Sequence, residues 1–279
     1  MQLETIDFQA SDAPQRFTQS LRDTGFGVLK NHPIKAETLQ AIYQHWQQFF
    51  DGNDKYNYRY NSDTQDGFFG ADVAETAKGF SQKDLKEYYH IYPWGQIPKE
   101  LADEILAYYK ATSDFAAQLL SWIEAHTPTE VAEHFSIPLA DMIRDSQQTL
   151  LRVLHYPPLT GNEPAGAVRA AAHEDINLIT ILPAATETGL QVLSKDNQWI
   201  DVPCDFGNLI INIGDMLQEA SNGYYPSTTH RVINPSGPAR FQSRISLPLF
   251  LHPNPEVVLS SRHTAYSYLQ ERLKELGVI

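Results

Sequence analysis

Hydrophobic residues in the first half of the chain recur mostly three and four positions apart, which predicts amphipathic helices. The clearest stripe covers residues 39–50, and a longer one covers residues 98–126. A shorter helix is expected over residues 13–24, and a last one over residues 265–276. Gly25 follows the first of these stripes, where a left-handed residue commonly ends a helix. These stripes are typical of helices that cover an apolar core.

The pattern changes near residue 149, where short apolar segments begin to alternate with turn residues. Two isolated strands are expected earlier, over residues 3–8 and 25–32. The second half contains eight strand candidates broken by Pro, Gly and Asn. They are Leu150–Tyr156, Ala167–His173, Leu178–Leu182, Leu190–Leu193, Trp199–Val202, Leu209–Ile213, Thr228–Ile233 and Arg244–Leu251.

Eight short strands of this kind predict a double-sheet jelly roll, also called a double-stranded β-helix, or a barrel. The fold class expected is α+β and mostly β, with the jelly roll as its core. Residues 1–148 would form a helical region packed against the core, and residues 149–279 the core with its C-terminal helix. Since no Gly/Ser-rich or Pro-rich linker separates the halves, we expect one compact unit.

Residues 51–98 are the least regular part of the chain. Phe68-Phe-Gly and Asp84–His90 mix aromatic and charged residues without a helical or strand period. Such segments fit either loop packing or a loop that carries binding residues. Both interpretations stay open at this point.

The composition limits the classes of partner. The formal net charge is −13 and the pI is about 5.1, which argues against nucleic acid and anionic membranes as partners. Cys204 is the only cysteine, so an intrachain disulfide or a cysteine-built metal site is excluded. No signal peptide is recognisable, and no apolar run approaches the roughly 20 residues of a membrane span. We therefore expect a soluble cytoplasmic protein.

Metal-ligating residue types gather near the end of the strand at residues 167–173. His173 and Asp175 are two positions apart, so on an extended segment they point to the same side. His230 falls on a later strand, and a jelly roll can bring distant strands together. Two histidines and one carboxylate form the facial set that suits non-haem Fe(II). Glu174 should point away from the metal.

An arginine stands on the otherwise apolar strand 244–251. Burying the Arg244 guanidinium is costly unless it is paired. It could pair with an internal Asp or Glu, or it could form a fork for a ligand carboxylate. Ser246 shares its strand face and could add a hydroxyl donor, as could Tyr156 from the first strand of the core.

These motifs together resemble the isopenicillin N synthase-like family of non-haem Fe(II)/2-oxoglutarate-dependent dioxygenases. The resemblance covers nearly the whole chain and includes Gly25-Phe-Gly-Val and Asn31-His32 in the N-terminal half. The matching residues elsewhere are Asp84-x-Lys-Glu, Tyr156-Pro157, His173-x-Asp175, Gly214-Asp215 with Ser221-Asn-Gly223, His230-Arg-Val and Arg244-x-Ser246. One departure is Leu154, which stands where the family's N-x-Y-P segment has Asn.

The resemblance implies a role for each matching residue. Fe(II) would be bound by His173, Asp175 and His230. The distal carboxylate of 2-oxoglutarate would be held by Arg244 and Ser246 with Tyr156. O₂ would be the co-substrate, with ascorbate a candidate reductant. Decarboxylation of 2-oxoglutarate would be coupled to hydroxylation of a small molecule, or to desaturation or cyclisation.

Two alternatives remain beside this one. An iron-dependent oxidase could use the same metal set without 2-oxoglutarate, and a jelly roll could bind a metal without catalysis or hold Zn²⁺ for hydrolysis. The substrate itself is not predicted by the sequence, and neither is the oligomeric state. The candidates for substrate contact are Lys86, Tyr88, Tyr89 and Tyr224.

Overall fold

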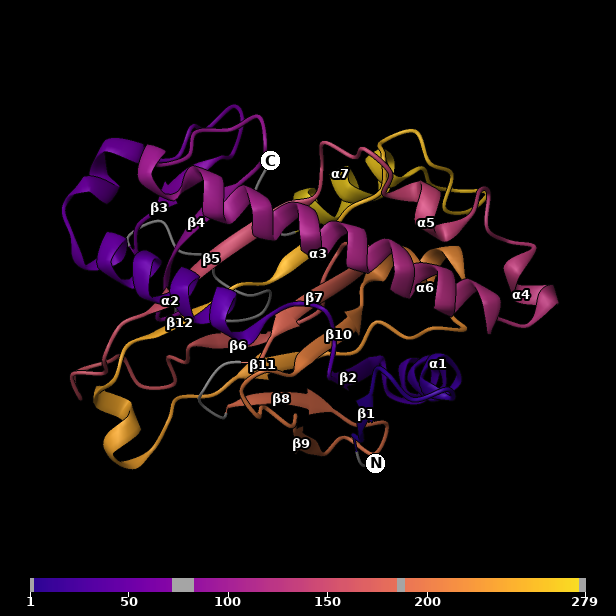
Figure 1. Ribbon diagram of the computed structural model, residues 1–279, viewed down its shortest axis with the longest axis horizontal. Coiled ribbons are helices and arrows are strands. Elements are labelled where there is room, and N and C mark those ends of the chain that lie inside the picture. The colour runs from indigo at the N-terminus through magenta and orange to yellow at the C-terminus, as the bar shows by residue number, and fades with distance from the viewer. Residues whose placement is uncertain (1–2, 72–82, 185–188, 276–279) are drawn as a thin grey trace.

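The computed structural model describes residues 3–71, 83–184 and 189–275, whose strands form two sheets (Figure 1). Within these residues the larger sheet has nine strands. Their spatial order is β1 (Thr5–Asp7), β2 (Phe26–Lys30), β10 (Leu209–Ile213), β7 (Ile179–Pro183), β13 (Leu249–Leu251), β5 (Leu150–Tyr156), β4 (Glu87–Ile91) and β3 (Gly67–Phe69), with β12 (Arg244–Ser246) beside β5. The smaller sheet has the order β6 (Ala170–His173), β11 (His230–Val232), β8 (Leu190–Leu193) and β9 (Trp199–Asp201).

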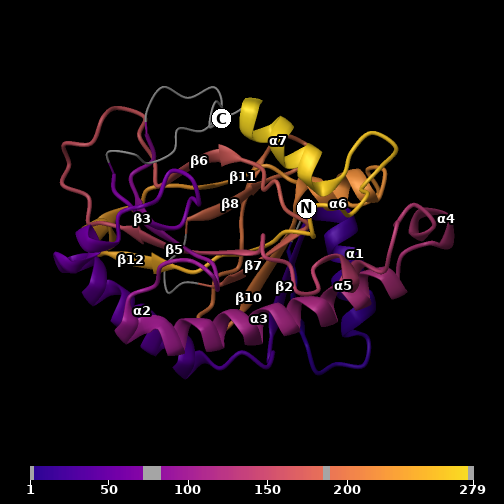
Figure 2. The same ribbon diagram turned by 90° about the horizontal axis from the view of Figure 1, so that it is seen from above.

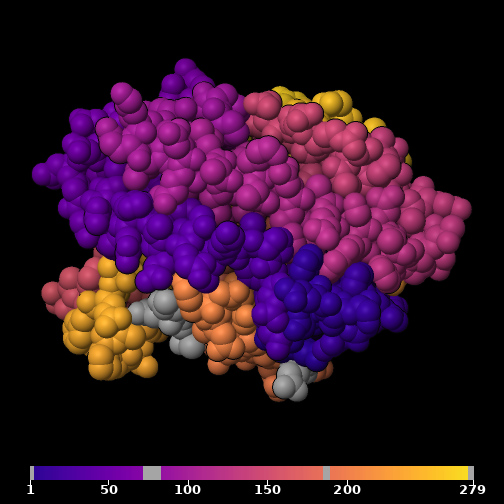
Figure 3. Space-filling model, in the orientation of Figure 1, coloured from indigo at the N-terminus to yellow at the C-terminus, as the bar shows by residue number. Residues whose placement is uncertain are grey.

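The helices α2 (Ala36–Asp51) and α3 (Lys99–Ala125) cover one face of the larger sheet, and the smaller sheet lies on its other face, on the same side as α7 (Ala265–Glu275) (Figure 2). In the view of Figure 1 the covering helices hide much of the larger sheet, as the space-filling surface shows (Figure 3). The long elements are α1 (Ala13–Thr24), α2 (Ala36–Asp51), α3 (Lys99–Ala125) and α7 (Ala265–Glu275). The short ones are α4 (Thr129–Ala132), α5 (Leu139–Met142), α6 (Asp215–Ala220) and the 3₁₀ turns η1 (Asp54–Tyr58) and η2 (Gly237–Phe241).

The apolar stripes explain why these helices lie where they do. On α2, the side chains of Leu39, Ile42, Trp46 and Phe50 are at most 1% exposed. Each such side chain contributes roughly 1.5–3 kcal/mol when it is fully buried. The α1 helix ends at Gly25, which adopts φ 74° and donates its N–H to the carbonyl of Leu21, as predicted.

The jelly-roll prediction is confirmed by the two facing sheets, and the predicted strands all recur with small shifts at their ends. The segment 244–251 is divided, because Leu247-Pro248 separates β12 from β13. The largest apolar cluster joins residues of both halves, among them Trp46 and Ile181. The boundary at residues 148/149 stays a prediction.

The interpretation of residues 51–98 as irregular loop is wrong for two segments. Phe68-Phe69 lies on β3 and Glu87–Ile91 forms β4, which pairs with β5 along its whole length. Both faces of β4 are covered, so its side chains show no polar–apolar alternation for the sequence to reveal. The larger sheet therefore extends beyond the jelly-roll core, toward the expected substrate side.

Candidate functional site

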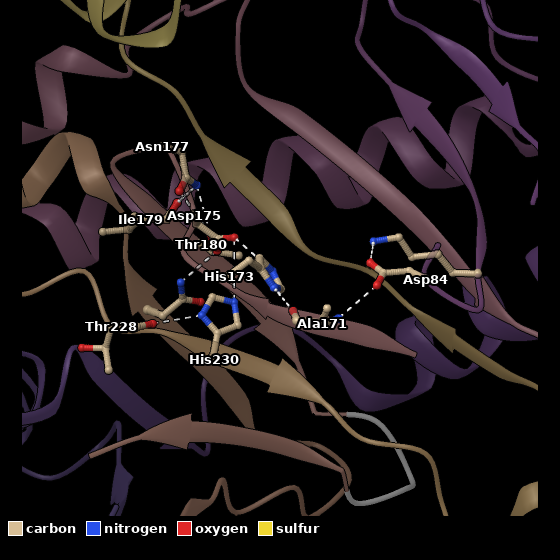
Figure 4. A network of polar contacts seen from close by, with 11 residues as sticks. Asp84, Ala171, His173, Asp175, Asn177, Ile179, Thr180, Thr228 and His230 are labelled. Atoms are coloured by element: carbon tan, nitrogen blue, oxygen red, sulfur yellow. Dashed lines mark hydrogen bonds and ion pairs between the residues drawn. The ribbon is translucent and has the colours of Figure 1, made fainter. Parts of the chain in front are cut away.

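Three candidate metal ligands meet between neighbouring strands of the smaller sheet (Figure 4). His173 ends β6, His230 begins β11, and the two are direct partners in the β6–β11 ladder. Asp175 follows two residues after His173, and its Oδ1 lies 3.9 Å from Nε2 of His173 and 3.8 Å from Nε2 of His230. The three candidate donor atoms all lie within 4.8 Å of one another.

Hydrogen bonds fix the two imidazoles so that the same ring nitrogen is presented in each. Nδ1 of His173 lies 2.7 Å from the carbonyl oxygen of Ala171, and Nδ1 of His230 lies 3.1 Å from that of Thr228. Since a carbonyl only accepts, each Nδ1 carries a proton, and in the neutral ring Nε2 then keeps its lone pair. Backbone acceptors of this kind orient metal-ligating histidines.

Asp175 is held as a carboxylate by two polar side chains. Its Oδ2 accepts hydrogen bonds from the Thr180 hydroxyl at 2.6 Å and the Asn212 amide at 2.9 Å. Burial alone would raise the pKa of this carboxyl, but the two histidines and these donors lower it overall. The remaining oxygen, Oδ1, faces the two Nε2 atoms and completes the set.

The pKa of His173 is lowered to about 4. Removal from water is the main cause, and the charge of the neighbouring His230 adds to it. The ring is therefore neutral near pH 7, which is the form that binds a metal. Two imidazoles and one carboxylate can bind one face of an octahedral ion and leave positions open, which suits Fe(II).

A turn behind Asp175 supports the backbone of that ligand. The N–H of Asp215 donates to the Asp175 carbonyl at 2.7 Å, and the N–H of Gly214 donates to the Leu178 carbonyl at 3.0 Å. A Cβ at Gly214 would lie 2.0 Å from the carbonyl oxygen of Asn177. Only glycine fits this close approach, and Asp215 shapes the turn.

The candidate carboxylate-binding residues also meet. Arg244 is the direct partner of Tyr156 in the β5–β12 ladder, and its guanidinium lies 5.7 Å from the centre of the Tyr156 ring. Ser246, two residues on, is buried and shares with Arg244 the face of the sheet turned away from α2, which we call the inner face. Leu154, at the family's Asn position, lies opposite Ser246 and packs in an apolar cluster with Tyr156.

The buried Arg244 guanidinium has two nitrogens that could bind an anion. The residue is only 7% exposed. Among the residues that the structure describes, its Nε and Nη1 find no hydrogen-bond partner. The internal Asp or Glu that the sequence left open as a partner is not found at these two nitrogens in the described residues. Burying a guanidinium without a partner is strongly unfavourable. A ligand carboxylate fits this donor set.

The four candidates for substrate contact divide into two groups. Lys86, directly before β4, and Tyr88, on β4, lie on the inner face, where Lys86 Nζ lies 5.9 Å from the centre of the Tyr88 ring. Tyr89 points to the opposite face, packs on Trp46 and donates its hydroxyl to the carbonyl of Gln96. Tyr224 lies under Arg22 of α1, 4.9 Å from that guanidinium. The structure therefore brings only the first two toward the inner face.

Sequence reasoning missed a residue that links the metal strand to this face. Asp84 accepts the N–H of Ala171 on β6 at 3.0 Å and pairs with Lys86 Nζ at 2.9 Å (Figure 4). The supports Thr180 and Asn212 were missed as well. Asp84 could have been singled out from its place in the Asp-x-Lys-Glu motif, whereas the other two carry no local signal.

The fold and the donor set define a jelly-roll protein with a two-histidine, one-carboxylate metal site. Two family profiles match the chain: the 2OG-Fe(II) oxygenase superfamily over residues 147–253, and the non-haem dioxygenase in morphine synthesis N-terminal family over residues 3–110. With the relatives described next, these matches show that the chain belongs to the 2OG-Fe(II) oxygenase superfamily.

The known relatives match this chain over most of their length. The chain is 30% identical to the bi-functional coumaroyl CoA and feruloyl CoA ortho-hydroxylase Diox1 of Ruta graveolens, covering 91% of this chain and 70% of that protein. It is 61% identical to a Shewanella oneidensis protein assigned as an oxygenase, whose crystal structure matches over 100% of both chains with a TM-score of 0.92. JOX2, solved in complex with 2OG, Fe and JA, is 25% identical, with coverage of 98% and 85% and a TM-score of 0.75.

The protein is thus an oxidoreductase that depends on Fe(II) and 2-oxoglutarate, as predicted. The use of ascorbate as a reductant stays a prediction. In the described residues, no helix is both long enough and apolar enough to cross a membrane.

Proposed function

We propose that His173, Asp175 and His230 bind the Fe(II), and that Arg244, Ser246 and Tyr156 hold the distal carboxylate of 2-oxoglutarate. The observation that carries this assignment is the buried guanidinium of Arg244, with its Nε and Nη1 unpaired in the described part of the chain. An iron oxidase without 2-oxoglutarate, or a structural metal site, leaves that cation unexplained.

The activity that we propose is hydroxylation of a small organic molecule. When bound, Fe(II) and 2-oxoglutarate supply an oxidation by O₂ in which the keto acid leaves as succinate and CO₂. The residues of this chain orient the reactants. The Asp175–Thr180–Asn212 bonds hold the carboxylate ligand in place, and the apolar cluster of Phe69, Tyr88, Leu154 and Tyr156 keeps water from the inner face.

The substrate would lie against the inner face of β4, next to Lys86 and Tyr88. The coumaroyl and feruloyl CoA esters named for Diox1, and the JA bound to JOX2, are small organic molecules, which supports this class. The net charge of −13 supports the expectation that nucleic acid is not the substrate. A cytoplasmic location remains part of the proposal, and a single cysteine is consistent with it.

A screen of succinate release tests the proposal and names the substrate. Amino acids, small peptides, phenolic acids and other metabolites are added to the Fe(II)-loaded enzyme with 2-oxoglutarate. A true substrate should raise succinate release and gain one oxygen in mass. Tyr88→Phe should change the KM for that substrate, while Tyr89→Phe, one residue on but on the other face, should not.

If no compound of any class raises succinate release above the uncoupled level, the proposed hydroxylase function is wrong. If stimulation occurs but Tyr89→Phe changes KM and Tyr88→Phe does not, the proposed substrate face is wrong.

A further inference from the structure

A chain of hydrogen bonds runs behind Arg244 and Tyr156, on the face of the larger sheet that α2 covers. Nδ1 of His155 lies 2.8 Å from Oε1 of Glu87, and its Nε2 lies 2.6 Å from the hydroxyl oxygen of Ser243. Ser243 in turn donates to Oε1 of Gln47 at 3.0 Å. Lys55 Nζ closes the other end on the two oxygens of Glu87, at 3.0 and 3.1 Å. We call Ser243, His155, Glu87 and Lys55 the back-face chain.

These residues come from four separate segments that meet at the 2-oxoglutarate end of the sheet. His155 lies on β5 between Leu154 and Tyr156, and Glu87 is its direct partner on β4. On the other side of β5, His155 is paired with Ile245 of β12. Because side chains alternate along a strand, His155 points away from the face that carries Tyr156. Its ring stacks on Phe50 of α2, 5.0 Å between centres.

The back-face chain is buried and charge-compensated. The side chains of His155, Glu87 and Lys55 are 6%, 14% and 12% exposed. Burial acts to raise the pKa of the Glu87 carboxyl, but hydrogen bonds from His155 and Lys55 outweigh it, and the pKa is lowered. Glu87 therefore stays ionised and accepts from both neighbours. Such paired, partly desolvated hydrogen bonds are stronger than those at the surface.

The strand that follows Ser243 is short. β12 is three residues long, and β5 is its one ladder partner among the described strands. The segment before it is exposed, with Phe241 at 63%. Ser243 is the residue directly before Arg244, so its hydroxyl bonds fix where β12 begins relative to β5. The same bonds therefore set the position of the Arg244 guanidinium along β12 relative to the Tyr156 ring.

The same three residue types activate a nucleophilic serine in hydrolases. Here the Ser243 hydroxyl is also bonded to the Gln47 amide of α2, on the face of the sheet turned away from Tyr156. The geometry therefore favours a positioning role over a nucleophilic one.

We infer that the back-face chain positions Arg244 and Tyr156 for the carboxylate of 2-oxoglutarate, an inference that rests on the proposed 2-oxoglutarate site. Ser243, His155 and Glu87 are then positioning residues that set 2-oxoglutarate affinity without touching the ligand. Their removal should weaken 2-oxoglutarate binding by about tenfold, since a shift of the guanidinium loses part of a charge-assisted contact. Binding of Fe(II) alone should stay as it is.

The test compares Ser243→Ala, Ser243→Thr and His155→Gln in the full-length protein loaded with Fe(II) under anaerobic conditions. 2-Oxoglutarate is titrated by its charge-transfer absorption, and KM for 2-oxoglutarate and kcat are measured by uncoupled succinate release. We expect Kd and KM to rise about tenfold in Ser243→Ala and His155→Gln, with kcat at saturation little changed. Ser243→Thr, which keeps the hydroxyl, should restore both values. Ser236→Ala, seven residues earlier at an exposed position, is the matched control.

A double variant Ser243→Ala/His155→Gln should be no worse than either single variant, because both break one chain. The inference is overturned if Ser243→Ala binds 2-oxoglutarate as tightly as the wild type, or if the variants lose thermal stability while KM stays the same. If the wild type itself shows no 2-oxoglutarate-dependent band, the proposed site fails rather than the back-face chain alone.

Discussion

His173 and His230 face each other across the β6–β11 ladder with their ring centres 4.4 Å apart, although 57 residues separate them in the sequence. The smaller sheet thus brings two candidate ligands together through backbone pairing alone. Asp175 completes the set because its carboxylate is held by Thr180 and Asn212 from the larger sheet. The candidate metal site therefore joins the two sheets.

The first prediction concerns the two acidic residues beside each other in this segment. Asp175→Ala should weaken Fe(II) binding by more than about 100-fold, since even the loss of an outer-shell partner typically costs 10–100-fold. Glu174→Ala is the matched control, because the Glu174 carboxylate accepts the Thr229 hydroxyl and points away from the metal. Anaerobic equilibrium titration of Fe(II) measures both. The assigned strand register is wrong if Glu174→Ala loses iron and Asp175→Ala keeps it.

The second prediction concerns the charge of Arg244. Arg244→Gln removes the cation that we propose for the distal carboxylate, so KM for 2-oxoglutarate should rise about 100-fold, the loss of one or two charge-assisted hydrogen bonds. The affinity for Fe(II) without 2-oxoglutarate should not change. Arg244→Lys keeps the charge but not the fork, and should give an intermediate KM. A KM unaffected by Arg244→Gln contradicts the assigned carboxylate site and favours an oxidase that does not use 2-oxoglutarate.

The third prediction concerns the close approach of Gly214 to Asn177. Gly214→Ala should lower the free energy of unfolding by more than about 3 kcal/mol, because its Cβ would overlap a backbone oxygen that cannot move aside. It should also weaken Fe(II) binding, since the same turn supports Asp175. Gly223→Ala is the comparison: Gly223 has φ 81°, and an added Cβ would meet no atom within 4 Å. Only the backbone strain of roughly 1–2 kcal/mol should therefore appear. Urea unfolding of both variants measures this; equal losses would count against the steric argument.

The fourth prediction is a pH dependence carried by His252. Burial, with the charge of Arg152 adding to it, lowers the pKa of His252 to about 4 from an ordinary 6.5. Between these values the unfolded chain binds the extra proton and the folded chain does not, so stability rises with pH across that window and is lost on acidification. His252→Gln should reduce this loss by up to about 3 kcal/mol between pH 6.5 and 4. Urea unfolding of metal-free protein at both pH values checks it, and an identical loss in the variant contradicts it.

The parts of this site that could be predicted from the sequence are those whose residues lie close together in the chain. His-x-Asp and Arg-x-Ser each lie within three residues, where the two-residue period of a strand places both side chains on one face. The helical stripes were equally readable, because each helix buries one side. Gly25 was also found, since its position after the stripe matches the left-handed conformation that it adopts.

What the sequence missed depends on contacts between distant strands. Thr180 and Asn212 are single polar residues on apolar strands, and no local pattern marks them. Only the folded structure places them beside Asp175. β4 is covered on both faces and gave no period, so Tyr88 and Tyr89 were treated alike, although they point to opposite sides. His155 stands directly before the Tyr156-Pro157 motif, and nothing in the local sequence singled it out. Its bonds to Glu87 and Ser243 span 68 and 88 residues, which no local pattern reveals.

We propose that one site holds both Fe(II) and 2-oxoglutarate. Anaerobic titration of the full-length protein with Fe(II), in the presence and absence of 2-oxoglutarate, tests it most directly. We expect a metal-to-ligand charge-transfer band that needs both components and is lost in Asp175→Ala. Bound Fe(II) with no band in the presence of 2-oxoglutarate would contradict it.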